Sequence, residues 1–127
     1  MSKALDTRLE IGNLSTRVDW GYAPDYTLAM QSILEHDSPA NFIIASGVTH
    51  SVRDIVDTAA GLLDLDWRSA VIENPGIVQR DPLPLCGDAA RLRQATGWEP
   101  RTTFVEMVRI LVEAAQAELL VIGNSLK

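Results

Sequence analysis

Residues 12–26, which read GNLSTRVDWGYAPDY, hold the densest group of side chains that could contact a ligand. Arg17 and Asp19 form a charged pair beside the aromatic Trp20. A guanidinium group can bind a carboxylate or a phosphate, and an aromatic ring can stack on a sugar or a base. We expect Trp20 to pack within the protein rather than to stack on a ligand. The segment therefore predicts a loop that contacts another molecule, with Arg17 and Asp19 as candidate residues.

The other side chains that could do chemistry are two histidines and one cysteine. His36 lies at a polar helix end and is expected to face solvent. His50 follows a predicted strand, where a structural hydrogen bond is expected rather than a role as general base or metal ligand. Cys86 has apolar and glycine neighbours and is expected to be a small buried residue. A single cysteine allows no intrachain disulfide and no cysteine-based zinc site, and we expect no metal.

The sequence contains no motif for a nucleotide cofactor. Its eight glycines are too far apart for the glycine-rich turn that approaches a pyrophosphate, and no P-loop is present. A tyrosine followed four residues later by a lysine, the proton-transfer pair of short-chain dehydrogenases, is also missing. The only lysines are Lys3 and Lys127. We therefore expect this chain to hold no cofactor-binding residue and no catalytic residue.

Length and composition predict one domain over residues 1–127. Hydrophobic residues make up 46% of the chain and charged residues 22%, which is typical of globular proteins. The formal net charge of −6 disfavours nucleic acid as a partner, because phosphate backbones are bound by basic surfaces. The N-terminus lacks the apolar part of a secretory signal, and no apolar run approaches the roughly 18 residues of a membrane span. We expect a soluble, cytoplasmic protein without membrane contact.

Four helices are expected from the spacing of the apolar residues and from the residues at their ends. They cover about residues 24–35, 52–63, 89–96 and 104–123. Capping boxes precede two of them, Gly97 ends the third, and Asp88 is its expected N-cap. The capping boxes are Ser51 with Asp54 and Thr103 with Glu106. The faces expected to be buried hold Tyr26, Ala29, Met30, Ile33 and Leu34 in the first helix and Phe104, Met107, Val108, Leu111, Val112 and Ala115 in the last.

Short strands are expected at residues 8–12, 41–47 and 69–73. The run at 41–47 is apolar and rich in β-formers, so it is expected to be a buried strand. Residues 74–86 hold three prolines and a glycine and are expected to form an irregular connection. Trp98 and Trp67 are each expected to cover a helix end. Because helices outnumber short and scattered strands, the pattern predicts a small α+β fold.

Four segments, read together, resemble a known family. They are IGNLSTRVDWGYAPDYTLAM, FIIASGVTHSVRDIVDTA, LDLDW and LCGDAARLRQATGWEPRTTFVEMV. In this order and spacing they closely resemble the C-terminal part of GDP-mannose 4,6-dehydratases, which are extended short-chain dehydrogenases. The resemblance covers about residues 9–115, and residues 116–127 are the end of the last helix and a tail.

The resemblance implies an architecture and a role. Members of the family convert GDP-mannose to GDP-4-keto-6-deoxymannose with a bound NADP. Their larger N-terminal half has the Rossmann fold and the catalytic residues, and their smaller C-terminal half binds much of the sugar nucleotide. This chain is then expected to be an α+β substrate domain of about four helices with short strands, lacking the Rossmann domain and its cofactor.

The resemblance also implies where a ligand would bind and where this chain departs from the family. The family has Arg-Asp-Trp-Gly at the loop described above, with the arginine at the diphosphate. Here Val18 occupies that position, and Arg17 lies one step away. In an extended segment one step turns a side chain to the opposite face. Arg17 and Asp19 remain the expected substrate-binding residues of this loop.

A second family anchor is an Arg-Pro-x-Glu stretch, with the arginine towards phosphate and the glutamate towards ribose. In this chain Val78 occupies the arginine position and Asp81 the glutamate position, while Arg80 lies nearby but out of register. Arg80 and Asp81 complete the implied substrate-binding set. With both arginines displaced, binding is expected to be weak or lost.

Three functional interpretations remain open. The chain could be a stand-alone substrate domain that is not catalytic by itself and binds GDP-mannose or GDP weakly or not at all. It could be an interaction module that forms a homodimer through the apolar face left by the missing half, because large apolar patches are rarely bare on soluble proteins. It could also complete a dehydratase together with a separate Rossmann-domain chain.

Overall fold

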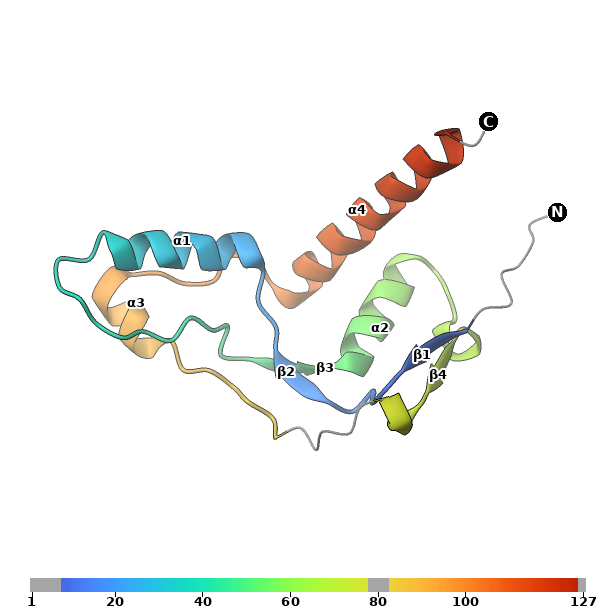
Figure 1. Cartoon of the computed structure of the whole chain (residues 1–127), viewed down its shortest axis with the longest axis horizontal. Coiled ribbons are helices and arrows are strands. Elements are labelled where there is room, and N and C mark those ends of the chain that lie inside the picture. Colours follow the sequence, from blue (N-terminus) through green and yellow to red (C-terminus); the bar gives the residue numbers. More distant parts are fainter. Residues whose placement is uncertain (1–7, 78–82, 126–127) are drawn as a thin grey trace.

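The computed structural model describes residues 8–77 and 83–125 (Figure 1). Within these residues it contains four α-helices and four short strands, which confirms the α+β prediction. The helices are α1 (Ala23–Leu34), α2 (Val52–Leu62), α3 (Ala90–Thr96) and α4 (Phe104–Ser125). The strands are β1 (Leu9–Ile11), β2 (Arg17–Asp19), β3 (Thr49–Ser51) and β4 (Val71–Glu73). Short 3-10 turns cover Trp67–Ser69 and Pro75–Ile77.

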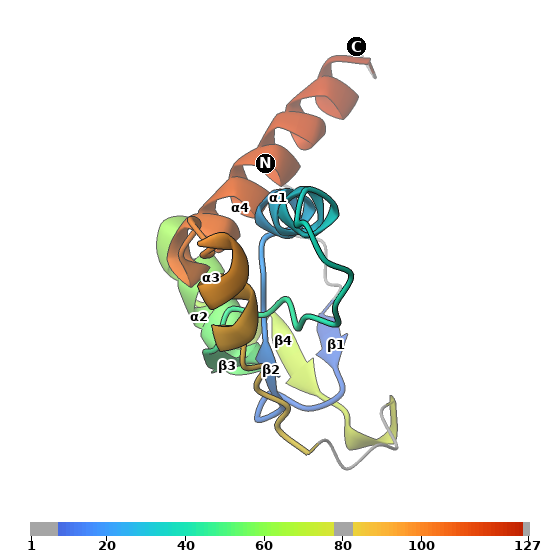
Figure 2. The same cartoon turned by 90° about the vertical axis from the view of Figure 1, so that its left-hand side faces the viewer.

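The strands of the described residues form two separate pairs. β1 pairs in parallel with β4, and β2 pairs antiparallel with β3. Figure 1 shows α1 and α3 at one end of the elongated molecule and β1 with β4 towards the other. α2 follows β3 directly and packs against the first part of α4. In the views of Figures 1 and 2, the rest of α4 extends away from the other elements.

The buried core lies between α1 and α3. Its members are Ala29, Ala89, Leu92 and Trp98, with Tyr26, Ile33, Phe42 and Ile44 packed around them. Trp98 is buried, as predicted, and its indole N–H donates to the Asp25 carbonyl at 3.0 Å. Its ring meets that of Tyr26 edge to face, with 6.1 Å between the centroids. This contact anchors the chain after α3 against α1.

The predicted local signals at the helix ends are confirmed. Ser51 and Asp54 form a reciprocal capping box at the start of α2. The Thr103 hydroxyl accepts from Glu106 N–H, and Glu106 accepts from Thr103, at the start of α4. Gly97 ends α3 with φ +74°, the left-handed conformation that glycine adopts at little cost. The predicted N-cap Asp88 is the exception: the N-cap of α3 is Ala89, and Asp88, one residue earlier, accepts from the Ala90 N–H at 2.9 Å.

The predicted strand at residues 41–47 is wrong. This segment is not assigned as a strand, because none of the described strands pairs with it. It nevertheless alternates: Phe42 and Ile44 pack on the core, while Ile43 is 57% exposed. The next strand along the chain, β3, begins at Thr49, after the predicted segment. The apolar composition of the segment therefore indicated which side chains approach the core. It did not indicate whether the backbone would pair with a strand.

Several burial predictions are also wrong. Met30 and Leu34 of α1 are exposed, because α3 covers only part of the helix surface. Leu111 and Ala115 of α4 are exposed because they lie near or past the point where α4 is covered. Cys86 is exposed, since Gly87 and not Cys86 is held against the neighbouring segments.

His36 is half-buried rather than solvated, because its ring rests edge to face on Phe42 at 5.7 Å. Trp67 is half-buried after α2, and its indole N–H donates to Asp57 of that helix at 2.6 Å. Within the described residues, no helix combines the length and the apolar character needed to cross a membrane.

Candidate functional site

The pairing of β2 with β3 decides where the side chains of the candidate loop lie. Val18 pairs with His50, and Asp19 pairs with Thr49. Directly paired residues share a face of an antiparallel ribbon, and successive residues alternate between faces. Val18 and His50 therefore lie on one face of the ribbon. Arg17 and Asp19 lie on the opposite face with Thr49.

Arg17 is engaged by the neighbouring strand. Its Nε donates to the Thr49 hydroxyl at 3.2 Å, and its Nη2 donates to the Thr49 carbonyl at 2.7 Å. These two hydrogen bonds hold the guanidinium along β3, on the face opposite Val18. At the position where the resemblance leads us to expect an arginine, the chain has the aliphatic Val18.

The Asp19 carboxylate joins three segments of the chain. Among the described residues it accepts from four donors: the Ser46 N–H at 3.0 Å, the Ser46 hydroxyl, the Gly47 N–H at 3.0 Å and the Gly87 N–H at 3.0 Å. Partial burial raises the pKa of Asp19, but these hydrogen bonds outweigh it and hold the pKa below its ordinary value. The carboxylate thus stays ionised and links β2 to two distant loops.

Gly87 is required by the close approach of these segments. A Cβ at this position would lie 2.2 Å from the Cβ of Ala45 and 3.6 Å from an Asp19 carboxylate oxygen. Two residues earlier, Leu85 forms an isolated parallel bridge with Val18. The chain before α3 therefore runs directly beside β2. Val78, Arg80 and Asp81 lie outside the described residues, so the second predicted anchor stays a prediction.

A cavity of about 270 Å³ opens beside His50 and Trp20. It is lined by Ser46, Val48 and the segment from Pro100 to Phe104 as well. The His50 ring stacks on Phe104 with 3.8 Å between centroids and an 11° angle between the planes. Trp20 donates its indole N–H to the His50 carbonyl at 3.1 Å. These contacts give both rings a packing role, as the sequence led us to expect for Trp20.

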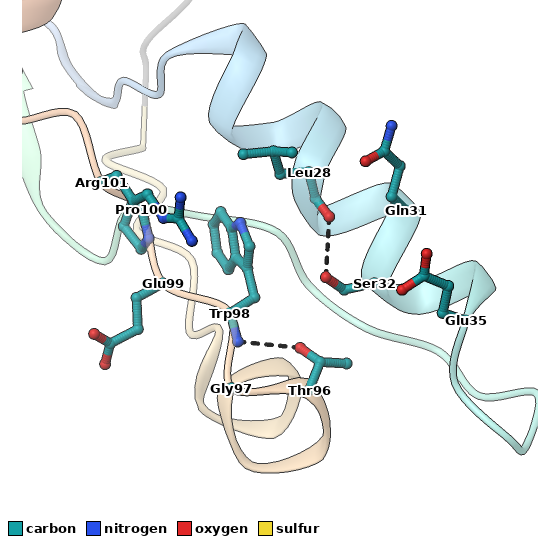
Figure 3. A pocket seen from close by; sticks show the side chains of 10 residues that line it. All are labelled: Leu28, Gln31, Ser32, Glu35, Thr96, Gly97, Trp98, Glu99, Pro100 and Arg101. Carbon is teal, nitrogen blue, oxygen red and sulfur yellow. Dashed lines mark hydrogen bonds between the residues drawn. The ribbon is translucent and has the colours of Figure 1, made fainter.

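A second cavity, of about 430 Å³, lies between α1 and the segment after α3 (Figure 3). Leu28, Gln31 and Ser32 line it from α1, and Glu35 lines it from the C-cap of that helix. Thr96 to Arg101 line it from the other side. Figure 3 shows the Trp98 ring between these walls, with Glu99 directed outward. Glu99 pairs with Arg93 at 3.0 Å. Acidic, basic and neutral polar groups are mixed here, so the lining favours no single class of ligand.

Sequence reasoning missed the role of Asp25. This carboxylate is only 6% exposed, and it accepts from the Arg101 N–H at 3.0 Å and the Thr102 N–H at 2.8 Å. Its position in the first turn of a predicted helix was the available signal, but an acidic residue there is common for electrostatic reasons alone. Within the described residues, no group of three histidine, cysteine, aspartate or glutamate side chains could hold a metal ion.

Comparisons with known proteins agree on one family. A family model described as GDP-mannose 4,6 dehydratase matches residues 1–111. The GDP-mannose 4,6 dehydratase of Drosophila melanogaster is 34% identical, with 83% of this chain and 31% of that protein covered. GDP-mannose 4,6 dehydratase 1 of Arabidopsis thaliana is 31% identical, with 86% and 30% covered. The chain thus spans about a third of the length of these curated relatives.

The fold is shared with larger solved structures. RMD from Pseudomonas aeruginosa, solved in complex with NADPH, superimposes with a TM-score of 0.75 at 23% identity. The match covers 84% of this chain and 35% of that protein. At this identity the likeness establishes the fold alone.

Proposed function

We propose that this chain, which belongs to the GDP-mannose 4,6-dehydratase family, is a substrate-binding region that keeps the family scaffold but binds sugar nucleotide weakly. The similarity is to the C-terminal region of the relatives. The proposed ligands are GDP-mannose and GDP. The proposed role excludes turnover by this chain alone, because its sequence holds neither the glycine-rich cofactor turn nor the tyrosine–lysine pair. A cytoplasmic location is part of the proposal and accords with the single cysteine.

One observation carries the proposal of weak binding. Val18 lies on the His50 face of β2, and the nearest cation in sequence, Arg17, lies on the opposite face and is hydrogen-bonded to Thr49. A charge-assisted contact to phosphate contributes about 1.5–3 kcal/mol. At about 1.4 kcal/mol per decade, loss of one such contact weakens binding by one to two decades.

The first test restores the missing charge. Val18→Arg is expected to bind GDP about 10–100-fold more tightly than the wild-type chain in isothermal titration calorimetry. Val18→Gln is the control, because it introduces a flexible polar side chain that is shorter than arginine and carries no charge. Circular dichroism of all variants checks that β2 still pairs.

Two further variants can overturn the proposal. Arg17→Ala and Arg80→Ala are expected to leave GDP binding weak and unchanged. If the wild-type chain binds GDP tightly and either variant loses this binding, the substituted arginine contacts the ligand from a position outside the family pattern. Conversion of GDP-mannose by the purified chain with added NADP would refute the absence of catalysis.

A second candidate function is an interaction module, and the segment 41–47 favours it. This segment alternates partly buried and exposed side chains over residues 41–44, has no strand partner within the described residues, and its Ile43 is 57% exposed. A backbone without a strand partner can accept a strand from another chain. The proposed partner is a second copy or a Rossmann-domain chain that completes a dehydratase.

Co-expression separates the two functions. A complex between this chain and a Rossmann-domain chain that converts GDP-mannose would support the module. Ile43→Lys is expected to weaken that complex, and Ile72→Lys on β4, also exposed, is the matched control. Failure of the two chains to associate would exclude this alternative.

A further inference from the structure

The second half of α4 is a hydrophobic helix segment without cover in the described part of the chain. Every described residue of α4 beyond Val112 is exposed. Four consecutive large apolar residues, Leu119, Leu120, Val121 and Ile122, are 50–70% exposed. Figures 1 and 2 show this end of α4 projecting away from the other elements. A helix surface of this kind is typical of a helix–helix contact.

The exposed surface continues the face by which α4 already packs. Met107 and Val108 are buried, in the part of α4 that contacts α2. Apolar residues then follow Val108 at alternating steps of four and three, which keeps them on one face. They are Val112, Ala115, Leu119 and Ile122. α4 has 22 residues against 11 in α2, and its face is uncovered beyond Val112.

The family model ends before this surface. It matches residues 1–111, so the uncovered half of α4 lies beyond the matched region. The inference that follows does not rest on the proposed function.

We propose that residues 112–122 of α4 pair antiparallel with the same segment of a second copy of this chain. In an antiparallel pair centred near residue 117, the small Ala115 of one copy meets the large Leu119 of the other. Val112 correspondingly meets Ile122. Alternating small and large side chains fill such an interface. A parallel pair would set Ala115 against itself and leave a gap.

Charge and shape favour a second copy over a lipid surface. Residues 110–125 contain Glu113 and Glu118 but no lysine or arginine. Helices that lie on membranes are usually rich in basic residues, which anionic lipids attract. Because α4 projects from the body, an antiparallel pair leaves the two bodies at opposite ends (Figure 1).

The contact is expected to be weak. The paired segment is about three helical turns long, which is smaller than the interfaces of about 1,200 Å² that hold stable complexes. We expect a dissociation constant of about 10–100 micromolar. Sedimentation velocity from about 1 to about 300 micromolar should show a reversible monomer–dimer equilibrium.

Two neighbouring leucines supply the decisive comparison. Leu119 lies on the proposed face and is 68% exposed, and Leu120 lies off that face and is 70% exposed. Leu119→Glu is expected to raise the dissociation constant by at least tenfold, whereas Leu120→Glu is expected to leave it within about twofold. Helix content by circular dichroism should be equal in the two variants.

Cross-linking tests the direction of pairing. In a Cys86→Ser background, Ala115→Cys and Leu119→Cys chains should form a mixed disulfide faster than either forms one with itself. A wild-type chain that stays monomeric over the whole range would overturn the proposal. So would equal loss of association in both glutamate variants, a preference for self-cross-linked chains, or sedimentation with anionic vesicles in place of dimers.

Discussion

At Asp19, a residue that the sequence suggests for ligand contact has a structural environment. Its carboxylate accepts hydrogen bonds from residues 46, 47 and 87, which are 27 to 68 positions away in the chain. Arg17 is likewise engaged, by Thr49. The charged pair of the opening loop therefore stabilises the meeting of three segments. Its contact with a ligand stays a prediction, which the calorimetric variants above address.

Asp19→Asn is expected to lower the free energy of unfolding by about 2 kcal/mol. The amide keeps the shape of the side chain, but its nitrogen cannot accept from the backbone N–H groups, and the charge that strengthens these bonds is lost. Urea denaturation followed by circular dichroism measures the change. Asp37→Asn, at an exposed position after α1, is the control for removal of a surface carboxylate.

The stability of the wild-type chain and that of Asp19→Asn should respond differently to acid. The pKa of Asp19 in the folded state is lowered from its ordinary value of 3.8 by the hydrogen bonds that its carboxylate accepts. Its stabilising effect is therefore present above pH 3.8 and is lost as the pH falls through the lower, folded-state pKa. The stability difference between wild type and Asp19→Asn should shrink between about pH 5 and pH 2. A difference that stays constant over this range would contradict the hydrogen-bond assignment.

At the scale of elements, helix ends are specified locally. α3 has only seven residues, so its termination at Gly97 and the turn into Trp98 matter for the core. α2, in contrast, carries Gly61 inside its last turn, where glycine weakens the helix. In neither position would an added Cβ meet another atom within 4 Å. Backbone conformation alone then determines the effect of a methyl group.

Gly97→Ala and Gly61→Ala are accordingly expected to change stability in opposite directions. Gly97 has φ +74°, which costs an alanine about 1 kcal/mol or more. Gly61 is helical, and alanine there should stabilise by about 0.5–1 kcal/mol. Thermal and urea unfolding of the two variants measure this. If both substitutions changed the stability in the same direction, the left-handed conformation of Gly97 at the end of α3 would be contradicted.

At the scale of the whole molecule, long-range contacts connect the elements of the described structure. Trp98 and Asp25 tie α1 to the chain after α3, and Asp19 ties β2 to the loops at 46–47 and 87. The α2–α4 contact joins the remaining helices. The β2 loop and the far half of α4 share none of these contacts, so they should act independently.

Crossed measurements test this independence. Leu119→Glu is expected to leave GDP affinity within about twofold of wild type, and Val18→Arg is expected to leave the dimer dissociation constant within about twofold. A double variant should show the sum of the two single effects. A tenfold change of GDP affinity in Leu119→Glu would show that the two surfaces are coupled.

The sequence alone determined the features that depend on near neighbours. The capping boxes at Ser51 and Thr103 and the glycine stop at Gly97 need only residues three or four positions apart, and all are found as predicted. The order of the four helices and the α+β class follow from the same periodicities. The alternation of Arg17 and Val18 follows from the geometry of extended chains.

Only the tertiary structure decided which strands pair and which side chains form hydrogen bonds with residues far away in the chain. The segment 41–47 has the composition of a strand, yet no described strand pairs with it, while Arg17–Asp19 pairs with β3. Cys86 is exposed because its neighbour Gly87 makes the close approach to Ala45. The partners of Asp19 and Asp25 lie far along the chain, where no local pattern points to them. Local preferences are set by steric limits within a few residues, whereas pairing and burial depend on where the rest of the chain lies.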